Sequence, residues 1–214
     1  MPGFIGIQHR PRFPKIAPAF SLQAVPSSFH HLTCLHEGKH FRLSGFTGAL
    51  HALTIPDAAV PSLPKGSPAK LERCLALCDA PYLLAPLHTA DESADTFVGK
   101  RAYRVTLASQ AIWLCRRQFY LARLWASFRM PCFDTAAEAI RFFRDHVTGD
   151  QSILCLPRAL FAAKTSRRFI ADGVLFIGVF LPARSLHAWV IEGGSLADPC
   201  DDAWINYRPV AALT

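Results

Sequence analysis

The chain has 214 residues, of which 51% are hydrophobic and 18% are charged. These proportions predict a sizeable packed core and exclude a wholly disordered protein. Lys and Arg number 23 against 16 Asp and Glu, which gives a formal net charge of +7. Such a charge suits nucleic acid, an anionic surface or an acidic peptide, and it equally suits a protein held away from its isoelectric point.

No apolar run reaches the roughly 18–20 residues that a membrane helix requires. The most apolar stretch, Gly173 to Phe180, has the length of a strand. The first residues lack a charged region followed by an apolar one, so we expect no signal peptide. Seven cysteines, odd in number and scattered along the chain, are typical of reduced thiols. We therefore expect a cytoplasmic protein without a membrane span.

The N-terminal part of the chain changes character twice. Residues 1–27 contain five prolines and predict an irregular arm. From Phe29 to Leu53 the pattern predicts a β-hairpin that turns near Gly38. A Pro-, Ser- and Gly-rich connection over 56–68 leads to a short helix predicted over Ala69 to Cys78, in which apolar residues recur at helical spacing.

The polar segment from Thr89 to Lys100 predicts a linker between two domains. Beyond it, apolar residues at helical spacing predict a helix over 105–128. Asp134 is the predicted N-cap of a further helix that continues through His146.

A cysteine stands where the next helix must begin. Pro157 lacks an N–H and is tolerated only in the first turn of a helix. A helix that contains Leu160 therefore begins near Cys155. The unpaired N–H groups at a helix start favour a thiolate and would also stabilise an oxyanion. A lone cysteine beside an apolar run is otherwise typical of a buried small hydrophobic residue, so the residues downstream decide its role.

Two apolar runs, Gly173 to Phe180 and Leu186 to Glu192, predict neighbouring strands. Gly193 and Gly194 predict a two-residue turn into a third strand. If these two residues form the whole loop, the register pairs the following residues: Glu192 with Ser195, Ile191 with Leu196, Trp189 with Asp198, and His187 with Cys200.

This register places His187, Asp198 and Cys200 on one face of the sheet. Asp198 is then the diagonal neighbour of His187 and is close enough to orient the imidazole of a catalytic base. Cys200 is a rival nucleophile, but it lacks the helix start that favours Cys155. Taken singly, His187 also fits a structural histidine, and Asp198 before a proline also fits a turn.

Metal and cofactor sites are not predicted. The dense His and Cys residues between His30 and His40, and the pair Cys74 and Cys78, lack the ligand spacing of a zinc site. The chain has no glycine-rich phosphate loop and no nucleophilic serine motif.

The segment from Leu154 to about Leu213 resembles the lasso-peptide biosynthesis B proteins, whose C-terminal domain is a transglutaminase-like cysteine peptidase. The resemblance is carried by the pieces that follow: Cys155-Leu156 with Arg158, the Arg-rich helix end, Gly178-Val179, the run from His187 to Val190, and an Asp after a Gly-containing turn. One departure is Ile191, where an acidic residue is expected; Glu192 follows one place later.

The resemblance implies a hydrolase with Cys155 as nucleophile, His187 as base and Asp198 as orienting acid. Its implied reaction is removal of the leader from a ribosomally made precursor, which frees the core for ring closure. The implied partners are the precursor leader and an asparagine-synthetase-like cyclase, with no nucleic acid. No cofactor is implied for this chain, because any ATP dependence belongs to the cyclase.

The total length implies the fused form of the family. We expect an α+β protein with a small winged-helix-like leader-recognition domain at 28–95 and a papain- or transglutaminase-like peptidase domain at 101–214, built of helices on an antiparallel sheet. The sequence identifies no leader-binding residues. Two alternatives stay open: an acyltransferase or transglutaminase of the same fold, and a non-catalytic protein that binds peptide or nucleic acid.

Overall fold

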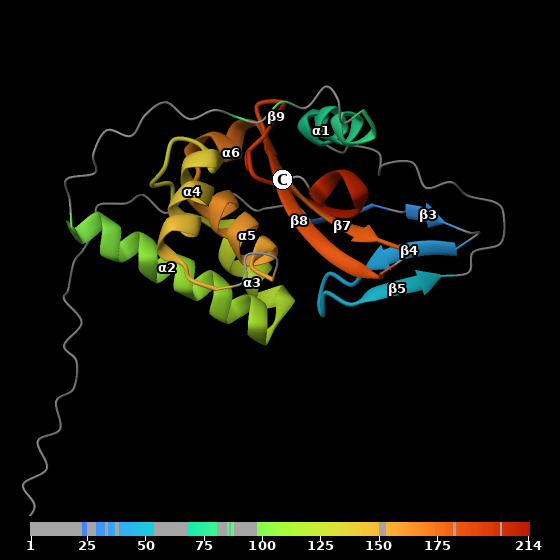
Figure 1. Cartoon of the computed structure of the whole chain (residues 1–214), viewed down its shortest axis with the longest axis horizontal. Helices are drawn as coiled ribbons and strands as arrows, with labels where there is room; N and C mark the ends of the chain where they lie inside the picture. The colour runs from blue at the N-terminus through green and yellow to red at the C-terminus, as the bar shows by residue number, and fades with distance from the viewer. Residues whose placement is uncertain are drawn as a thin grey trace, which may run out of the picture.

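A computed structural model describes residues 23–24, 29–32, 34–36, 39–53, 68–80, 85, 87, 98–149, 153–181, 183–201 and 203–214. Over these ranges the chain is an α+β protein in which helices pack against antiparallel sheets (Figure 1). Most of the predicted arm at 1–27 and most of the predicted linker lie outside the described residues. Of the helices described, none combines the length and hydropathy needed to cross a membrane.

The central sheet has five antiparallel strands in the order β2–β10–β7–β8–β9. Its strands are β2 (Phe29–His31), β7 (Gly173–Phe180), β8 (Ser185–Glu192), β9 (Ser195–Leu196) and β10 (Arg208–Leu213). The two apolar runs thus form the strands that they predict. The turn is also confirmed, because Gly193 and Gly194 have φ values of 60° and 75°, the left-handed backbone of a two-residue hairpin loop.

A second sheet consists of β3 (Cys34–His36), β4 (Lys39–Leu43) and β5 (Leu50–Leu53). The predicted hairpin is confirmed by the antiparallel pairing of β3 with β4, and β5 adds a third strand. A short ladder joins β1 (Gln23–Ala24) to β6 (Phe128–Arg129).

The helices are α1 (Ala69–Asp79), α2 (Val98–Arg117), α3 (Phe119–Ser127), α4 (Ala136–His146), α5 (Cys155–Thr165) and α6 (Arg167–Asp172). The single helix predicted over 105–128 is wrong, since Gln118 is extended, with φ −161° and ψ 122°, and separates α2 from α3.

The cap of α4 is displaced by one residue from the prediction. The side chain of Thr135, not of Asp134, accepts a hydrogen bond from the N–H of Glu138 at 3.2 Å. The Glu138 carboxylate in turn accepts from the N–H of Asp134 at 3.0 Å. This reciprocal pair is close to a capping box, and it satisfies one N–H group left free at the helix start and the N–H of Asp134 just before the cap.

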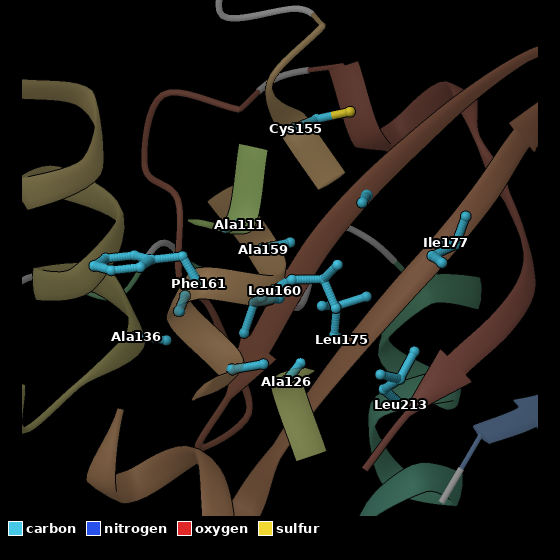
Figure 2. Packing of buried hydrophobic residues seen from close by; sticks show 14 of the residues in the cluster. Ala111, Ala126, Ala136, Cys155, Ala159, Leu160, Phe161, Leu175, Ile177 and Leu213 are labelled. Atoms are coloured by element: carbon cyan, nitrogen blue, oxygen red, sulfur yellow. The ribbon is translucent and has the colours of Figure 1, made fainter. Parts of the chain in front are cut away.

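The central sheet carries a hydrophobic cluster on each face, because side chains alternate along its strands. On one face α5 packs on β7 and β8, where Leu160, Phe161 and Leu175 are buried (Figure 2). On the other face α1 supplies Leu71, which packs with Trp189 and its neighbours. Figure 1 shows α2 to α6 on one side of β7 and β8, and α1 on the other.

The N-terminal segment contributes to both clusters. β2 pairs with β10, so Phe29–His31 form one edge strand of the central sheet. Leu43 lies in the cluster with α5, and Leu71 lies in the opposite cluster. Within the described residues, the ranges 28–95 and 101–214 therefore share a sheet and a core. A unit as small as the first range is marginal alone, and burial against a larger sheet stabilises it.

Candidate active site

Cys155 is the first residue of α5, as the position of Pro157 predicts. The first helical hydrogen bond runs from the N–H of Arg158 to the carbonyl of Leu154 at 3.0 Å. Pro157 lies in the first turn, where its missing N–H removes no helical bond. Cys155 is buried, and Figure 2 shows it at one end of the core cluster, apart from Leu160 and Leu175.

His187 lies on β8, opposite Gly178 of β7. Its ring is buried and contacts two aromatic rings, with centroid distances of 6.2 Å to Trp189 and 5.0 Å to Tyr207. Gly178 makes room for this arrangement, because a Cβ at that position would lie 2.6 Å from the Trp189 ring. The glycine therefore allows Trp189 to lie across β7 and to support the imidazole.

The thiol of Cys155 hydrogen-bonds the ring of His187 and accepts the backbone N–H of Ala188. That N–H is available because β9 is short. The N–H of Ala197 donates to the carbonyl of Val190 at 2.9 Å, and the β8–β9 ladder ends there. Ala188, two residues before Val190, points its N–H to the same side of β8, beyond the end of β9. The sulfur occupies this open edge.

The charges of the pair follow from these contacts. Burial alone would raise the pKa of Cys155, but the hydrogen bond and positive charge of His187, the Ala188 N–H and the nearby Arg158 lower it below its ordinary value. Burial would lower the pKa of His187, but its bonds to Asp201 and Cys155 raise it to about 9. Both shifts favour the thiolate–imidazolium pair.

Asp201 is the carboxylate that contacts His187. His187 Nε2 lies 2.7 Å from Asp201 Oδ2, and a protonated ring donates this bond. The second oxygen, Oδ1, accepts from the N–H of Ala203 at 3.2 Å, and the carboxylate is buried. Asp201 thus fixes the orientation of the ring and leaves the other ring nitrogen for the thiol. Sequence analysis did not single out this residue.

The structure does not bring Asp198 to His187. Asp198 Oδ2 instead lies 2.9 Å from Arg144 and 3.2 Å from Arg158, and its Oδ1 accepts from the N–H of Cys200. Burial raises the pKa of Asp198, against the lowering effect of the two arginines. The carboxylate therefore ties the loop after β9 to α4 and α5. Its predicted contact with the imidazole is wrong in this structure.

The reason lies in the register of β9. The predicted pairs of Ile191 with Leu196 and of Glu192 with Ser195 are confirmed, but the ladder does not continue to Asp198 or to the exposed Cys200. Pro199 carries the signal that could have shown this, since a residue without an N–H interrupts a ladder. The chain turns there and presents Asp201 to the ring.

Glu192 is also structural. Its buried carboxylate accepts from the N–H of Ala136 at 2.9 Å and from the Ser166 hydroxyl at 2.6 Å. Burial raises its pKa, which these two bonds oppose. The residue joins the end of β8 to the start of α4 and to the N-cap of α6.

A cleft of about 520 Å³ opens beside the thiol. Its walls come from the start of α5, the start of β8, the joint between α2 and α3, and the loop between β4 and β5. Cys155, His187 and Ala188 all line it, so a molecule bound in the cleft would contact both members of the pair. Among the residues that the structure describes, no three His, Cys, Asp or Glu side chains gather as metal ligands.

Comparison of the chain with protein-family models, with curated proteins and with solved structures returned no match. The class of site is therefore defined by its own geometry. A thiol at a helix start contacts an imidazole, and the imidazole contacts a buried carboxylate. This order of nucleophile, base and orienting acid is typical of cysteine-dependent acyl transfer.

The ion pair predicts the pH dependence of the thiol. Alkylation of Cys155 by iodoacetamide should remain fast below pH 9.0, its ordinary pKa, because His187 lowers that pKa. The imidazolium is lost as the pH rises through about 9, so any reaction that needs both ions should decline there. The measurement is the alkylation rate from pH 5 to 10 in a Cys200→Ala background, with mass spectrometry to locate the label.

The control is His187→Ala. Burial, the largest influence on Cys155, then acts without the imidazole, and the pKa of the thiol should rise above its ordinary value. An unchanged profile in this variant would contradict the assignment of His187.

Proposed function

We propose that the chain is a cysteine peptidase that removes the leader from a ribosomally made lasso-peptide precursor. The observation that carries this proposal is the hydrogen-bonded series Cys155, His187 and Asp201 beside an open cleft. The resemblance of the segment from Leu154 to about Leu213 to the B proteins supplies the substrate class. The lowered pKa of Cys155 supports a thiolate nucleophile.

The proposed reaction proceeds through a thioester. The Cys155 thiolate attacks the carbonyl at the leader–core junction, and the N–H groups at the start of α5 stabilise the oxyanion. The C–N bond then breaks as the His187 imidazolium gives its proton to the leaving amine of the core. Water, deprotonated by His187, attacks the thioester, releases the leader as a carboxylate and returns the thiol.

The proposal extends to the N-terminal segment and to the partners. We assign leader recognition to residues 28–95, where β3 and β5 form the outer strands of a three-stranded sheet; an extended peptide binds such an edge as an added strand. An asparagine-synthetase-like cyclase would then use the freed core amine to close the macrolactam. Seven free thiols support a reducing compartment such as the cytoplasm.

The decisive experiment incubates the purified protein with the precursor and weighs the products. Peptidase action gives a leader and a core whose summed mass exceeds the precursor by one water. Transglutaminase action gives a cross-linked product that has lost ammonia. If neither product forms, with or without the cyclase, and the protein binds nucleic acid in a steeply salt-dependent manner, the non-catalytic alternative replaces the proposal.

A further inference from the structure

The charge of the cleft is one-sided. Apart from the Cys155–His187 ion pair, the charged side chains among its described lining residues are Arg116 and Arg117, and none of those residues is Asp or Glu. Asp201 lies behind His187, to which it is bonded, and is not one of the described lining residues. The two arginines therefore give this part of the lining its positive charge, and the Arg117 guanidinium lies 5.7 Å from the centroid of the Trp113 ring.

These arginines lie at a defined joint of the backbone. They end α2, and the extended Gln118 turns the chain directly into α3. Phe119 anchors this joint: it is buried, and a Cβ on Gly48 would lie 3.1 Å from its ring. Because Gly48 has a φ of 74°, the loop between β4 and β5 adopts a backbone that favours glycine and approaches the ring closely. Both arginines are exposed at this joint.

The rest of the cleft is largely apolar. Leu156 and Ile177 belong to the lining, and so do Ile153, which is 70% exposed, and Leu186, which is 39% exposed. Apolar side chains this exposed beside a reactive thiol are covered when a substrate binds. A nucleic-acid strand would need cations along the whole groove, whereas here the two arginines stand together at one wall.

We propose that the cleft selects a peptide in which a Glu or Asp side chain lies next to an apolar residue near the cleaved bond. Arg116 and Arg117 bind the carboxylate, and Ile153 and Leu186 cover the apolar side chain. Arginine suits this role because its planar guanidinium pairs with a carboxylate through two parallel hydrogen bonds. The inference rests on the proposed peptidase function and specifies which side chains of the substrate the site reads.

The test uses fluorogenic peptides that differ only by Glu or Gln at each of the four positions on either side of a fixed bond. At one position the wild-type protein should cleave the Glu peptide with a kcat/KM about 5-fold higher, as expected for a solvent-exposed ion pair. The difference should lie in KM rather than kcat. It should shrink in 0.5 M salt, because the Debye length there is only about 4 Å and exposed charges are screened. The double variant Arg116→Gln/Arg117→Gln should cleave the two peptides equally.

The matched control is Arg101→Gln/Arg141→Gln, which removes the same charge from exposed arginines outside the described lining of the cleft. It should keep the preference for Glu. Equal cleavage of Glu and Gln peptides at every position by the wild-type protein would overturn the inference, and so would an equal loss of preference in the control. If the arginine variant only lowers Tm, the two residues serve the end of α2 and the inference fails.

A binding measurement separates this inference from the proposed function. Cys155→Ala protein is titrated with fluorescein-labelled Glu and Gln peptides, and the fluorescence anisotropy is followed. Tighter binding of a Glu peptide supports the inference even if no peptide is cleaved, in which case it is the peptidase proposal that fails. Equal binding, together with thiol-dependent cleavage, rejects the inference and leaves the peptidase proposal standing.

Discussion

Replacing Cys155 with alanine should lower the rate of leader release by about 10³-fold or more, the scale seen when a catalytic nucleophile is removed. In the proposed reaction the sulfur forms the thioester, and among the described residues the His187 ring is bonded to this thiol and to Asp201. The measurement is the initial rate of precursor cleavage by mass spectrometry, with the fold checked by circular dichroism. The side chain becomes smaller, so the variant should remain folded.

Two other cysteines serve as controls. Cys200 is exposed, and its backbone N–H is bonded to Asp198. Cys115 lines the same cleft, but burial raises its pKa to about 12, so it stays a thiol. Alanine at either position should leave the rate within a few fold of the wild-type rate. Loss of cleavage in Cys200→Ala, with activity kept in Cys155→Ala, would reassign the nucleophile.

Asp201→Asn and Asp198→Asn should have different effects, although the two residues lie in one loop. Asn at 201 removes the charge that raises the pKa of His187, and its amide permits the wrong tautomer of the ring. We expect kcat to fall by roughly 10²- to 10⁴-fold. The alkaline limb of the pH profile should also move below its wild-type position near 9.

Asn at 198 should act mainly on stability. It removes the buried carboxylate that pairs with Arg144 and Arg158. Removing one partner of a buried ion pair typically lowers the free energy of unfolding by about 3–5 kcal/mol. Urea unfolding measures this loss. At low temperature, where the variant is folded, the alkaline limb of its kcat pH profile should stay near that of the wild-type protein. If Asp198→Asn moves the limb and Asp201→Asn does not, the orienting acid is Asp198, as the sequence pattern predicted.

The features that sequence analysis predicted well depend on local chemistry. Pro157 determined the start of α5, and the apolar runs and paired glycines determined β7, β8 and the turn. Each of these signals lies within a few residues of its effect. The register next to the turn was therefore predictable as well.

The features that it missed depend on contacts between distant segments. The Asp198 carboxylate is bonded to Arg144 of α4 and Arg158 of α5. Both arginines are far from it in the sequence, so no local pattern shows that this carboxylate already has partners. The break at Gln118 involves neither Pro nor Gly. There, the N–H of Tyr120 donates to the carbonyl of Phe46 across the fold.

The main-chain donor at Ala188 makes part of the thiolate's environment independent of side-chain identity. Any residue except proline at 188 presents the same N–H to the sulfur, because the position is set by the β8 backbone and the early end of β9. Ala188 also lines the cleft. Because the Ala188 side chain is buried in the cluster with α5, only a small residue fits there, and the sulfur keeps its backbone hydrogen bond with any such residue.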